Sequence, residues 1–171
     1  MSTWGRNNGE QTPKKNWSLE EARGKLETYC SYQERCIWEL RRKLFEKGIQ
    51  GQAVDTILAE LEASGFVDEE RFARSYARGK FRIKKWGKGR ITQELKGRQI
   101  SSALIQLGLS EIDGEEYFAI LEREAEKKWE KTKEKDGFKK QYLVTQYLMS
   151  KGFEQDLIQE ALFPLISQEK D

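Results

Sequence analysis

Histidine is absent from the 171 residues of this chain. Because histidine is the commonest general base and the commonest metal ligand in proteins, its absence removes the usual centre of an acid–base or metal site. With only two cysteines, a structural zinc site would also lack its four ligands. The chain has no Gly-x-x-x-x-Gly-Lys-Ser/Thr loop, Gly-x-Ser-x-Gly elbow or Gly-x-Gly-x-x-Gly turn. We therefore expect a binding protein without a cofactor, and not an enzyme.

Proline is also scarce, and the two prolines, Pro13 and Pro164, lie near the ends of the chain. Since proline breaks helices, the interval between them is free to form long ones. The only cysteines, Cys30 and Cys36, are six residues apart and would point to different faces of a helix. This spacing matches neither a Cys-x-x-Cys metal site nor a disulfide framework. We predict reduced thiols that pack as small apolar side chains.

Long apolar runs are missing as well. No stretch approaches the roughly 20 apolar residues that span a bilayer, and the first residues lack the apolar core of a signal peptide. The prediction is a cytoplasmic protein with no membrane contact. Apolar residues make up 37% of the chain and charged residues 35%, a balance that favours thin helical layers with large solvated faces.

Helical periodicity begins after a polar segment. Residues 1–16 are rich in Gly, Asn and Lys and have too few apolar positions to join a core, so we predict a disordered tail there. Ser18 then suits a helix N-cap, and Glu21 three residues later completes a capping box. From that point apolar residues recur with helical spacing. Breaks that contain glycine, among them Leu107-Gly108, divide the chain into about nine helical segments.

Three of these segments repeat one pattern. The sequence Leu44-Phe-Glu-Lys-Gly-Ile49 matches residues 95–100 and 148–153, at offsets of 51 and 53 residues. The match extends to an apolar residue four positions before each leucine and to an apolar pair after each turn, at Leu40, Ile91 and Val144 and at Ala53-Val54, Leu104-Ile105 and Leu157-Ile158. Chance agreement among leucine-rich helix ends would not explain why the apolar positions agree as well.

The predicted fold is all-α, with three tandem three-helix repeats. Residues 17–65 would form the first repeat, residues 66–111 the second and residues 112–171 the third. A three-helix unit of this size buries little by itself, so neighbouring repeats would share a core and form an elongated, curved molecule.

Positive charge is concentrated in the predicted second repeat. The whole chain carries +2, but residues 71–98 contain eleven basic residues and one acid, Glu94, so this segment carries +10 and the remainder −8. On a helix over residues 68–85, five basic residues would fall within about 80° of one another, forming a ridge of Arg71, Arg74, Arg78, Arg82 and Lys85. Because the ridge contains no acid, we predict that an anionic partner binds it, either DNA phosphates or an acidic protein groove. A solvated face is the alternative.

The connection Trp86-Gly-Lys-Gly-Arg90 has two interpretations. Backbone N–H groups at the start of the following helix would suit a phosphate. Alternatively, the glycines form a tight interhelical turn with Trp86 covering the core.

Two segments of the second repeat resemble the central signature of the RecX family, whose members regulate the RecA recombinase. They are Gly65-Phe-Val-Asp-Glu-Glu-Arg-Phe-Ala-Arg-Ser-Tyr-Ala77 and Gly89-Arg-Ile-Thr-Gln-Glu-Leu95. The preceding Glu39-Leu-Arg-Arg-Lys-Leu44 and Lys47-Gly48 resemble the family's first repeat. The likeness runs from about residue 29 to residue 162. Departures are Gln99 in place of the glycine of the other repeats, and Cys36 in place of an expected serine.

The resemblance implies a monomeric protein of three-helix repeats, without a cofactor, that binds the RecA–DNA filament. Such a protein would lodge in the filament groove or block its growing end, and would lower ATP hydrolysis and strand exchange. It would thereby restrain homologous recombination, DNA repair and the SOS response. The candidate residues for binding DNA or the RecA filament are Arg71, Arg74, Arg78, Arg82, Lys84, Lys85, Lys88, Arg90, Lys96 and Arg98.

Two other functions are compatible with the sequence. A general nucleic-acid-binding helical repeat protein without a RecA link would bind single- or double-stranded DNA alone, with a steep dependence on salt. A scaffold for unrelated proteins would expose an apolar patch on the third repeat, around Tyr142 and Tyr147.

Overall fold

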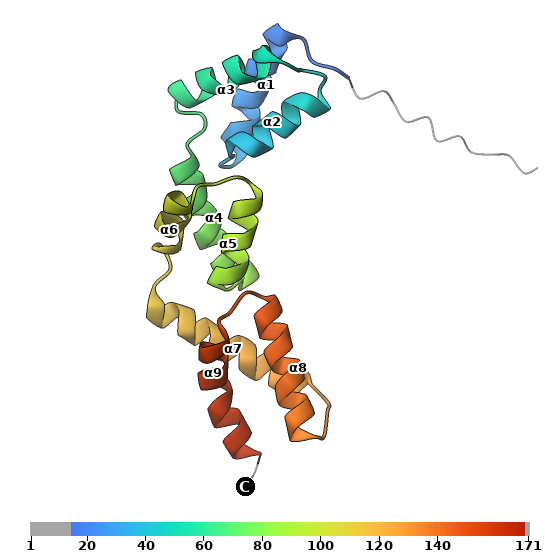
Figure 1. Cartoon of the computed structure of the whole chain (residues 1–171), viewed down its shortest axis with the longest axis vertical. Coiled ribbons are helices and arrows are strands. Elements are labelled where there is room, and N and C mark those ends of the chain that lie inside the picture. The colour runs from blue at the N-terminus through green and yellow to red at the C-terminus, as the bar shows by residue number, and fades with distance from the viewer. Residues whose placement is uncertain (1–14, 170–171) are drawn as a thin grey trace, which may run out of the picture. The chain divides into compact units, whose positions relative to one another are not determined.

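The structure is a computed structural model that describes residues 15–169. In this range it contains nine α-helices and no strand (Figure 1), which confirms the all-α prediction. The disordered tail predicted for residues 1–16 lies, apart from its last two residues, outside the described range. No helix within residues 15–169 combines the length and the apolarity that crossing a membrane requires. The helices are α1 (Leu19–Tyr32), α2 (Ile37–Glu46), α3 (Gln52–Ala63), α4 (Glu69–Lys84), α5 (Lys88–Gly97), α6 (Ser102–Leu109), α7 (Gly114–Lys131), α8 (Gly137–Ser150) and α9 (Gln155–Gln168).

The chain divides into two compact units. Helices α1–α3 form one, over residues 15–33 and 37–67, and helices α4–α9 form the other, which also includes residues 34–36. In the first unit, the Ser18 side chain accepts from the Glu21 backbone N–H while Glu21 accepts from that of Ser18, which is the predicted capping box. The core of this unit is built from buried aliphatic side chains of all three helices, including Leu26, Leu44 and Leu58. Cys30 is half-buried and Cys36 is buried, so both side chains pack into the fold as predicted.

The turn that follows the second helix of each repeat has the same geometry. Gly48, Gln99 and Gly152 all adopt positive φ, at 82°, 59° and 95°. In each repeat the next backbone N–H, from Ile49, Ile100 or Phe153, donates to the leucine carbonyl five residues earlier, at 3.0, 3.1 and 3.2 Å. These hydrogen bonds close a helix end in which a left-handed residue reverses the chain. The geometry confirms the repeat that the sequence pattern predicted.

Helix α4 packs against α6 in the second unit, and glycine makes this approach possible. Helix α4 begins after the N-cap Asp68 and ends at the left-handed Lys85, as the sequence predicted. A Cβ atom on Gly108 would lie 2.7 Å from the carbonyl oxygen of Ala73 on α4. The predicted break at Leu107-Gly108 is wrong by two residues, because α6 continues through Gly108 to Leu109. The glycine allows close helix packing instead of ending the helix.

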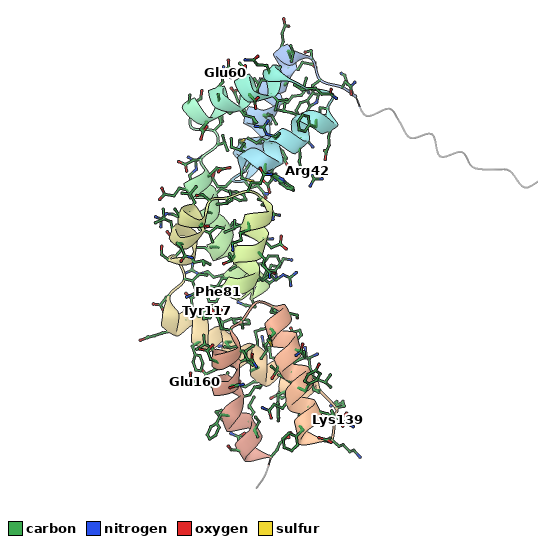
Figure 2. The ribbon with its side chains drawn as sticks, in the orientation of Figure 1. Arg42, Glu60, Phe81, Tyr117, Lys139 and Glu160 are labelled. Atoms are coloured by element: carbon green, nitrogen blue, oxygen red, sulfur yellow. The ribbon has the colours of Figure 1, made fainter. Side chains whose placement is uncertain are left out.

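A buried aromatic stack connects the second and third repeats. Phe81 of α4 and Tyr117 of α7 lie against each other (Figure 2), with ring centroids 5.7 Å apart. Tyr117 also contacts Phe153, with a centroid distance of 5.4 Å. All three rings are at least 96% buried, so helices α4–α9 share a core across the boundary between two repeats.

Candidate anion-binding surface

The middle of the predicted basic ridge is neutralised by carboxylates. Arg74 contacts Glu70 at 2.9 Å and Glu111 at 2.7 Å, and Arg78 contacts the other oxygen of Glu111 at 3.0 Å. The hydrogen bonds from Arg74 and Arg78 hold the pKa of Glu111 below its ordinary value, and the hydrogen bond to Glu111 raises the pKa of Arg74. Two guanidinium groups therefore share one carboxylate that lies at the end of α6.

The ends of the ridge are paired in the same way. Arg71 donates from Nε to Glu34, a residue that belongs to the same unit as α4, at 2.6 Å. Arg82 lies 3.5 Å from the Glu116 carboxylate on α7. Lys85 directs its ammonium group to the Arg82 carbonyl oxygen.

The expectation that this ridge lacks acidic neighbours was therefore wrong. The count over residues 71–98 missed Glu70, which lies one position before the segment, and carboxylates such as Glu111 that are 33 to 37 residues away. These acids become neighbours only because α6 and the start of α7 pack beside α4. Arg98 is also paired, with Glu94 of its own helix at 3.0 Å.

A second group of cations has no carboxylate partner among the described residues. Part of this group was predicted as binding residues: Lys84, Lys85, Lys88, Arg90 and Lys96. Lys80 shares the property but was not among the predicted binding residues. The unneutralised charge of the second repeat thus lies around the junction of α4 and α5 and along α5, and of the predicted ridge it includes only Lys85.

Aromatic rings are interleaved with these cations. The Arg90 guanidinium lies 4.1 Å from the centre of the Trp86 ring, and the Lys80 ammonium lies 5.1 Å from it. Lys80 is also 5.3 Å from the Tyr76 ring, and Lys88 is 4.9 Å from the Tyr117 ring. Such contacts hold a cation in place without cancelling its charge. We call Lys80, Lys84, Trp86, Lys88 and Arg90 the basic corner.

Sequence reasoning missed Lys80 and Trp86 as members of this corner, although a signal was present. Tyr76 and Lys80 are four residues apart on one helix, and Trp86 and Arg90 are four apart across the turn. This spacing brings a ring and a cation together on a helix.

The turn between α4 and α5 does not form a phosphate site. The N–H of Gly87 donates to the Lys151 carbonyl at 2.7 Å, and the N–H of Gly89 donates to the Gly152 carbonyl at 2.9 Å. The N–H between them, from Lys88, donates to the Tyr117 hydroxyl at 3.0 Å. All three donors at the start of α5 are already satisfied by the third repeat, so the phosphate interpretation is wrong. The tight-turn interpretation is correct, with Trp86 half-buried beside the turn.

Three family models match the chain in order. The model of the RecX first three-helix domain matches residues 22–61. The models of the second and third three-helix domains match residues 68–109 and 115–162. Curated relatives agree. A protein of Pelodictyon phaeoclathratiforme named regulatory protein RecX is 30% identical over 75% of this chain and 78% of its own length. A Haemophilus influenzae protein of the same name is 32% identical over 74% of this chain and 82% of its own length.

The chain belongs to the RecX family.

The fold of the family agrees with that of this chain. A solved structure described as regulatory protein RecX superposes with a TM-score of 0.75 at 25% identity, and the match covers 83% of this chain and 71% of that structure. The ridge and the basic corner both lie within the segment that matches the RecX second three-helix domain. The relatives carry the name of regulatory proteins.

The basic corner offers this RecX chain the chemistry for binding anions. Ammonium and guanidinium groups donate hydrogen bonds to phosphate or carboxylate oxygens, and aromatic rings stack on bases or pack against apolar side chains. Among the described residues, no three acidic or cysteine side chains gather closely enough to hold a metal ion.

Proposed function

We propose that the chain is a non-enzymatic regulator of the RecA recombinase that binds the RecA–DNA filament and lowers its ATP hydrolysis and strand exchange. The observation that carries this proposal is the ordered match of all three RecX domains, together with relatives named regulatory proteins. The consequence in the cell would be restraint of homologous recombination, DNA repair and the SOS response.

In this proposal, the basic corner supplies the principal electrostatic contact with the filament. Its four cations have no carboxylate partner among residues 15–169, so binding an anion requires no ion pair within the chain to be broken. Lys85 and Lys96 extend the same surface. The ridge arginines contribute less net charge, because Glu70, Glu111 and Glu116 lie beside them.

The mechanism is steric and electrostatic. Cations of the second repeat contact DNA phosphates or an acidic RecA surface, and the other repeats contact adjacent RecA protomers. A chain held in this way hinders the rearrangement of protomers that accompanies ATP hydrolysis. No bond-making step by this chain is needed.

The direct test is RecA ATP turnover on single-stranded DNA with and without the purified chain, with DNA strand exchange as a second measurement. We expect the chain to lower both rates and to hydrolyse no ATP alone. Unchanged turnover at a large molar excess over RecA protomers would contradict the proposal. The variant Lys80→Gln, Lys84→Gln, Arg90→Gln should inhibit less well. As a control, Lys131→Gln, Lys133→Gln, Lys135→Gln removes the same charge from the third repeat.

The basic corner also favours a second candidate function, binding of nucleic acid without RecA. Cations beside aromatic rings are typical of proteins that bind single-stranded nucleic acid. In that case the corner variant would lose affinity for naked DNA, while the parent chain would leave RecA turnover unchanged at salt concentrations that abolish DNA binding.

A further inference from the structure

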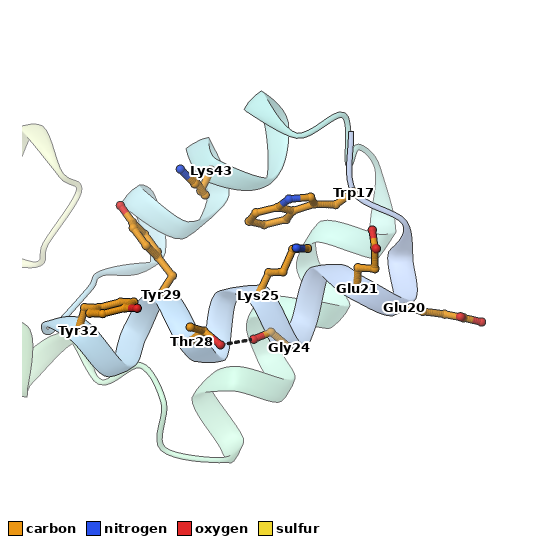
Figure 3. A pocket seen from close by; sticks show the side chains of 9 residues that line it. All are labelled: Trp17, Glu20, Glu21, Gly24, Lys25, Thr28, Tyr29, Tyr32 and Lys43. Atoms are coloured by element: carbon orange, nitrogen blue, oxygen red, sulfur yellow. Dashed lines mark hydrogen bonds between the residues drawn. The ribbon is translucent and has the colours of Figure 1, made fainter. Parts of the chain in front are cut away.

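The first repeat contains an open groove that the proposed function does not use. It lies beside α1 and α2, has a volume of about 660 Å³, and is lined by Trp17, Tyr29 and Tyr32 together with Lys25 and Lys43 (Figure 3). All the lining residues belong to the first unit. This volume lies in the range that suits a drug-sized molecule or a few side chains of a peptide.

The groove is aromatic and locally cationic. The Lys25 and Lys47 ammonium groups lie 5.8 and 5.6 Å from the Trp17 ring, and the Lys43 ammonium lies 5.2 Å from the Tyr29 ring. No salt bridge joins any of these three lysines to a carboxylate among the described residues, although Lys25 attracts Glu21 at longer range. Each is held by a ring, which leaves its charge available to an incoming anion.

The two acids at the groove do not cancel this charge equally. The Glu21 carboxylate accepts a hydrogen bond from the Ser18 backbone N–H at 3.1 Å, and this bond lowers the pKa of Glu21. The Glu21 carboxylate is therefore engaged in capping helix α1. The side chain of Glu20 points away from the groove (Figure 3).

A smaller hollow of about 280 Å³ adjoins the groove and shares Tyr29 and Lys43 with it. It adds Trp38, whose ring centre lies 4.7 Å from the Arg42 guanidinium. Glu39 and Glu46 also line this hollow, so its charges are mixed and the lysine-rich part of the surface ends at Lys43. A short acidic segment would therefore fit the groove, whereas a longer one would meet these carboxylates.

The wall of the groove contains a glycine that no contact within the chain explains. Gly24 lies in the middle of α1, where glycine costs about 1 kcal/mol relative to alanine. Its φ is not positive, and a Cβ atom placed on it would meet nothing within 4 Å. Neither turn geometry nor close packing requires glycine at this position. Because Gly24 lines the groove, a large side chain at this position would take up part of its space.

We propose that this groove binds an acidic peptide segment of a partner protein. An aromatic or large aliphatic side chain of the peptide would sit over Gly24 beside the rings of Trp17 and Tyr29. Carboxylates on either side of it would contact Lys25, Lys43 and Lys47. The exposure of Tyr32, 79% of whose surface is open to solvent, leaves a further ring for the peptide to cover.

Charge favours a peptide over a nucleic-acid strand at this site. Residues 17–65 contain seven basic and nine acidic residues, a net charge of −2, whereas residues 71–98 carry +10. A continuous polyphosphate would be repelled by the acids of the first repeat over about a Debye length, roughly 8 Å. A short peptide with a few carboxylates matches three local lysines without extending over those acids.

The test uses the full chain and a short fluorescein-labelled peptide composed of Asp, Glu and Phe, with binding followed by fluorescence anisotropy. One control peptide carries Asn and Gln in place of the acids, and another carries Ala in place of Phe. Labelled oligothymidine is the nucleic-acid probe. Gly24→Leu fills the groove at a position with open space, and the matched control Gly79→Leu places the same side chain on α4, where the added Cβ also meets nothing within 4 Å.

We expect the acidic Phe peptide to bind the parent and Gly79→Leu equally, and Gly24→Leu at least about tenfold more weakly. Lys25→Gln with Lys43→Gln should weaken binding by at least about tenfold, which corresponds to a single charge-assisted hydrogen bond at the low end of its range. Both control peptides should bind less well than the acidic Phe peptide.

Three results would overturn the proposal. Peptide binding that Gly24→Leu leaves unchanged would place the peptide elsewhere. Oligothymidine binding that Gly24→Leu abolishes, without a matching effect on the peptide, would assign the groove to nucleic acid. Self-association of the parent that Gly24→Leu reverses in sedimentation would assign it to a second copy of the chain. RecA is absent from these assays, so the proposal succeeds or fails independently of the proposed function.

Discussion

The hydroxyl group of Tyr117 donates a 2.6 Å hydrogen bond to the Glu154 carboxylate. The same oxygen accepts a 3.0 Å hydrogen bond from the backbone N–H of Lys88. Because Lys88 begins α5 and Glu154 is the N-cap of α9, one buried hydroxyl connects α7 to the starts of two other helices. Burial, supported by the hydrogen bond to Glu154, raises the pKa of Tyr117 above its ordinary value of 10.0.

Replacing Tyr117 with phenylalanine should lower the stability of the second unit. The ring would keep its contacts with Phe81 and Phe153, but the Lys88 N–H would lose its buried acceptor. We expect the free energy of unfolding to fall by about 1–3 kcal/mol, measured by urea denaturation and circular dichroism. Tyr142→Phe, which alters an exposed side chain, should change it by less than about 0.5 kcal/mol. Equal effects of the two variants would contradict this role for the hydroxyl.

The same substitution should alter the dependence of stability on alkaline pH. Since the folded state keeps Tyr117 protonated while the unfolded state releases its proton near pH 10.0, the folded state binds more protons above that pH. The contribution of Tyr117 is therefore complete below pH 10.0 and is lost as the pH rises beyond it. The difference in unfolding free energy between the parent and Tyr117→Phe should narrow from pH 9 to pH 11, roughly one unit on each side. A constant difference would show that the hydroxyl is not held in its neutral form.

The basic corner and the ridge should differ in salt dependence if DNA is the anionic partner. Lys80→Gln, Lys84→Gln, Arg90→Gln removes three cations that have no carboxylate partner, so the slope of log affinity against log salt should flatten by about two to three units. Arg74→Gln, Arg78→Gln, Glu111→Gln removes two cations together with the carboxylate that they share, a net change of one charge, and leaves Glu70 in place. Its slope should change by about one unit or less. If the ridge variant had the larger effect, our assignment of the surface would be wrong.

A methyl group at Gly87 should disrupt the junction of the second and third repeats. A Cβ atom there would lie 2.3 Å from the backbone carbonyl carbon of Gly152, and backbone atoms cannot move aside as a flexible side chain would. We expect Gly87→Ala to lower the free energy of unfolding by about 1–3 kcal/mol. Gly97→Ala is the matched control, because its added methyl group meets nothing within 4 Å on the same helix. A destabilisation by Gly97→Ala as large as that by Gly87→Ala would rule out the steric explanation.

Gln99 occupies a left-handed position that the other two repeats fill with glycine. A residue with a Cβ atom costs about 1–2 kcal/mol in this conformation. Glycine avoids this steric cost, but it also raises the conformational entropy of the unfolded chain, which offsets part of the stabilisation. Gln99→Gly should therefore stabilise the chain by up to about 1 kcal/mol, visible as a higher urea midpoint with an unchanged m-value. The reverse change, Gly48→Gln, should destabilise it. The explanation fails if both substitutions shift the midpoint in the same direction.

Local sequence patterns predicted much of the fold. Ser18 with Glu21 identified the start of α1, because caps depend on residues within one turn of the helix. The start of α4 was predicted at about residue 68, and the structure has its N-cap there. The turns at Gly48, Gln99 and Gly152 were aligned correctly, since the apolar pattern and the backbone geometry repeat together. These features are decided by neighbours in the sequence.

The binding surface could be predicted only in part. Glu111 pairs with Arg74 and Arg78 because α6 folds back beside α4, and nothing in the local sequence of α4 reveals that. The three N–H groups after Trp86 were open to two interpretations, and the structure shows that Lys151, Gly152 and Tyr117 accept their hydrogen bonds. In both cases the deciding partner lies on another pair of helices, and the apolar periodicity of one helix does not predict which residues of another pack against it.

The turn at Gly152 differs from its counterpart at Gly48 in what surrounds it. A Cβ on Gly152 would lie 2.3 Å from the Arg90 backbone nitrogen, whereas a Cβ on Gly48 would meet only the side chain of Asn16. In the third repeat, the turn at Gly152 thus receives the start of α5, and the carbonyl groups of this turn accept hydrogen bonds from the backbone N–H groups there. The repeats are alike in fold but cannot exchange places. A side chain at Gly87 or at Gly152 would meet backbone atoms across this contact, so the start of α5 and the turn before α9 can change only together.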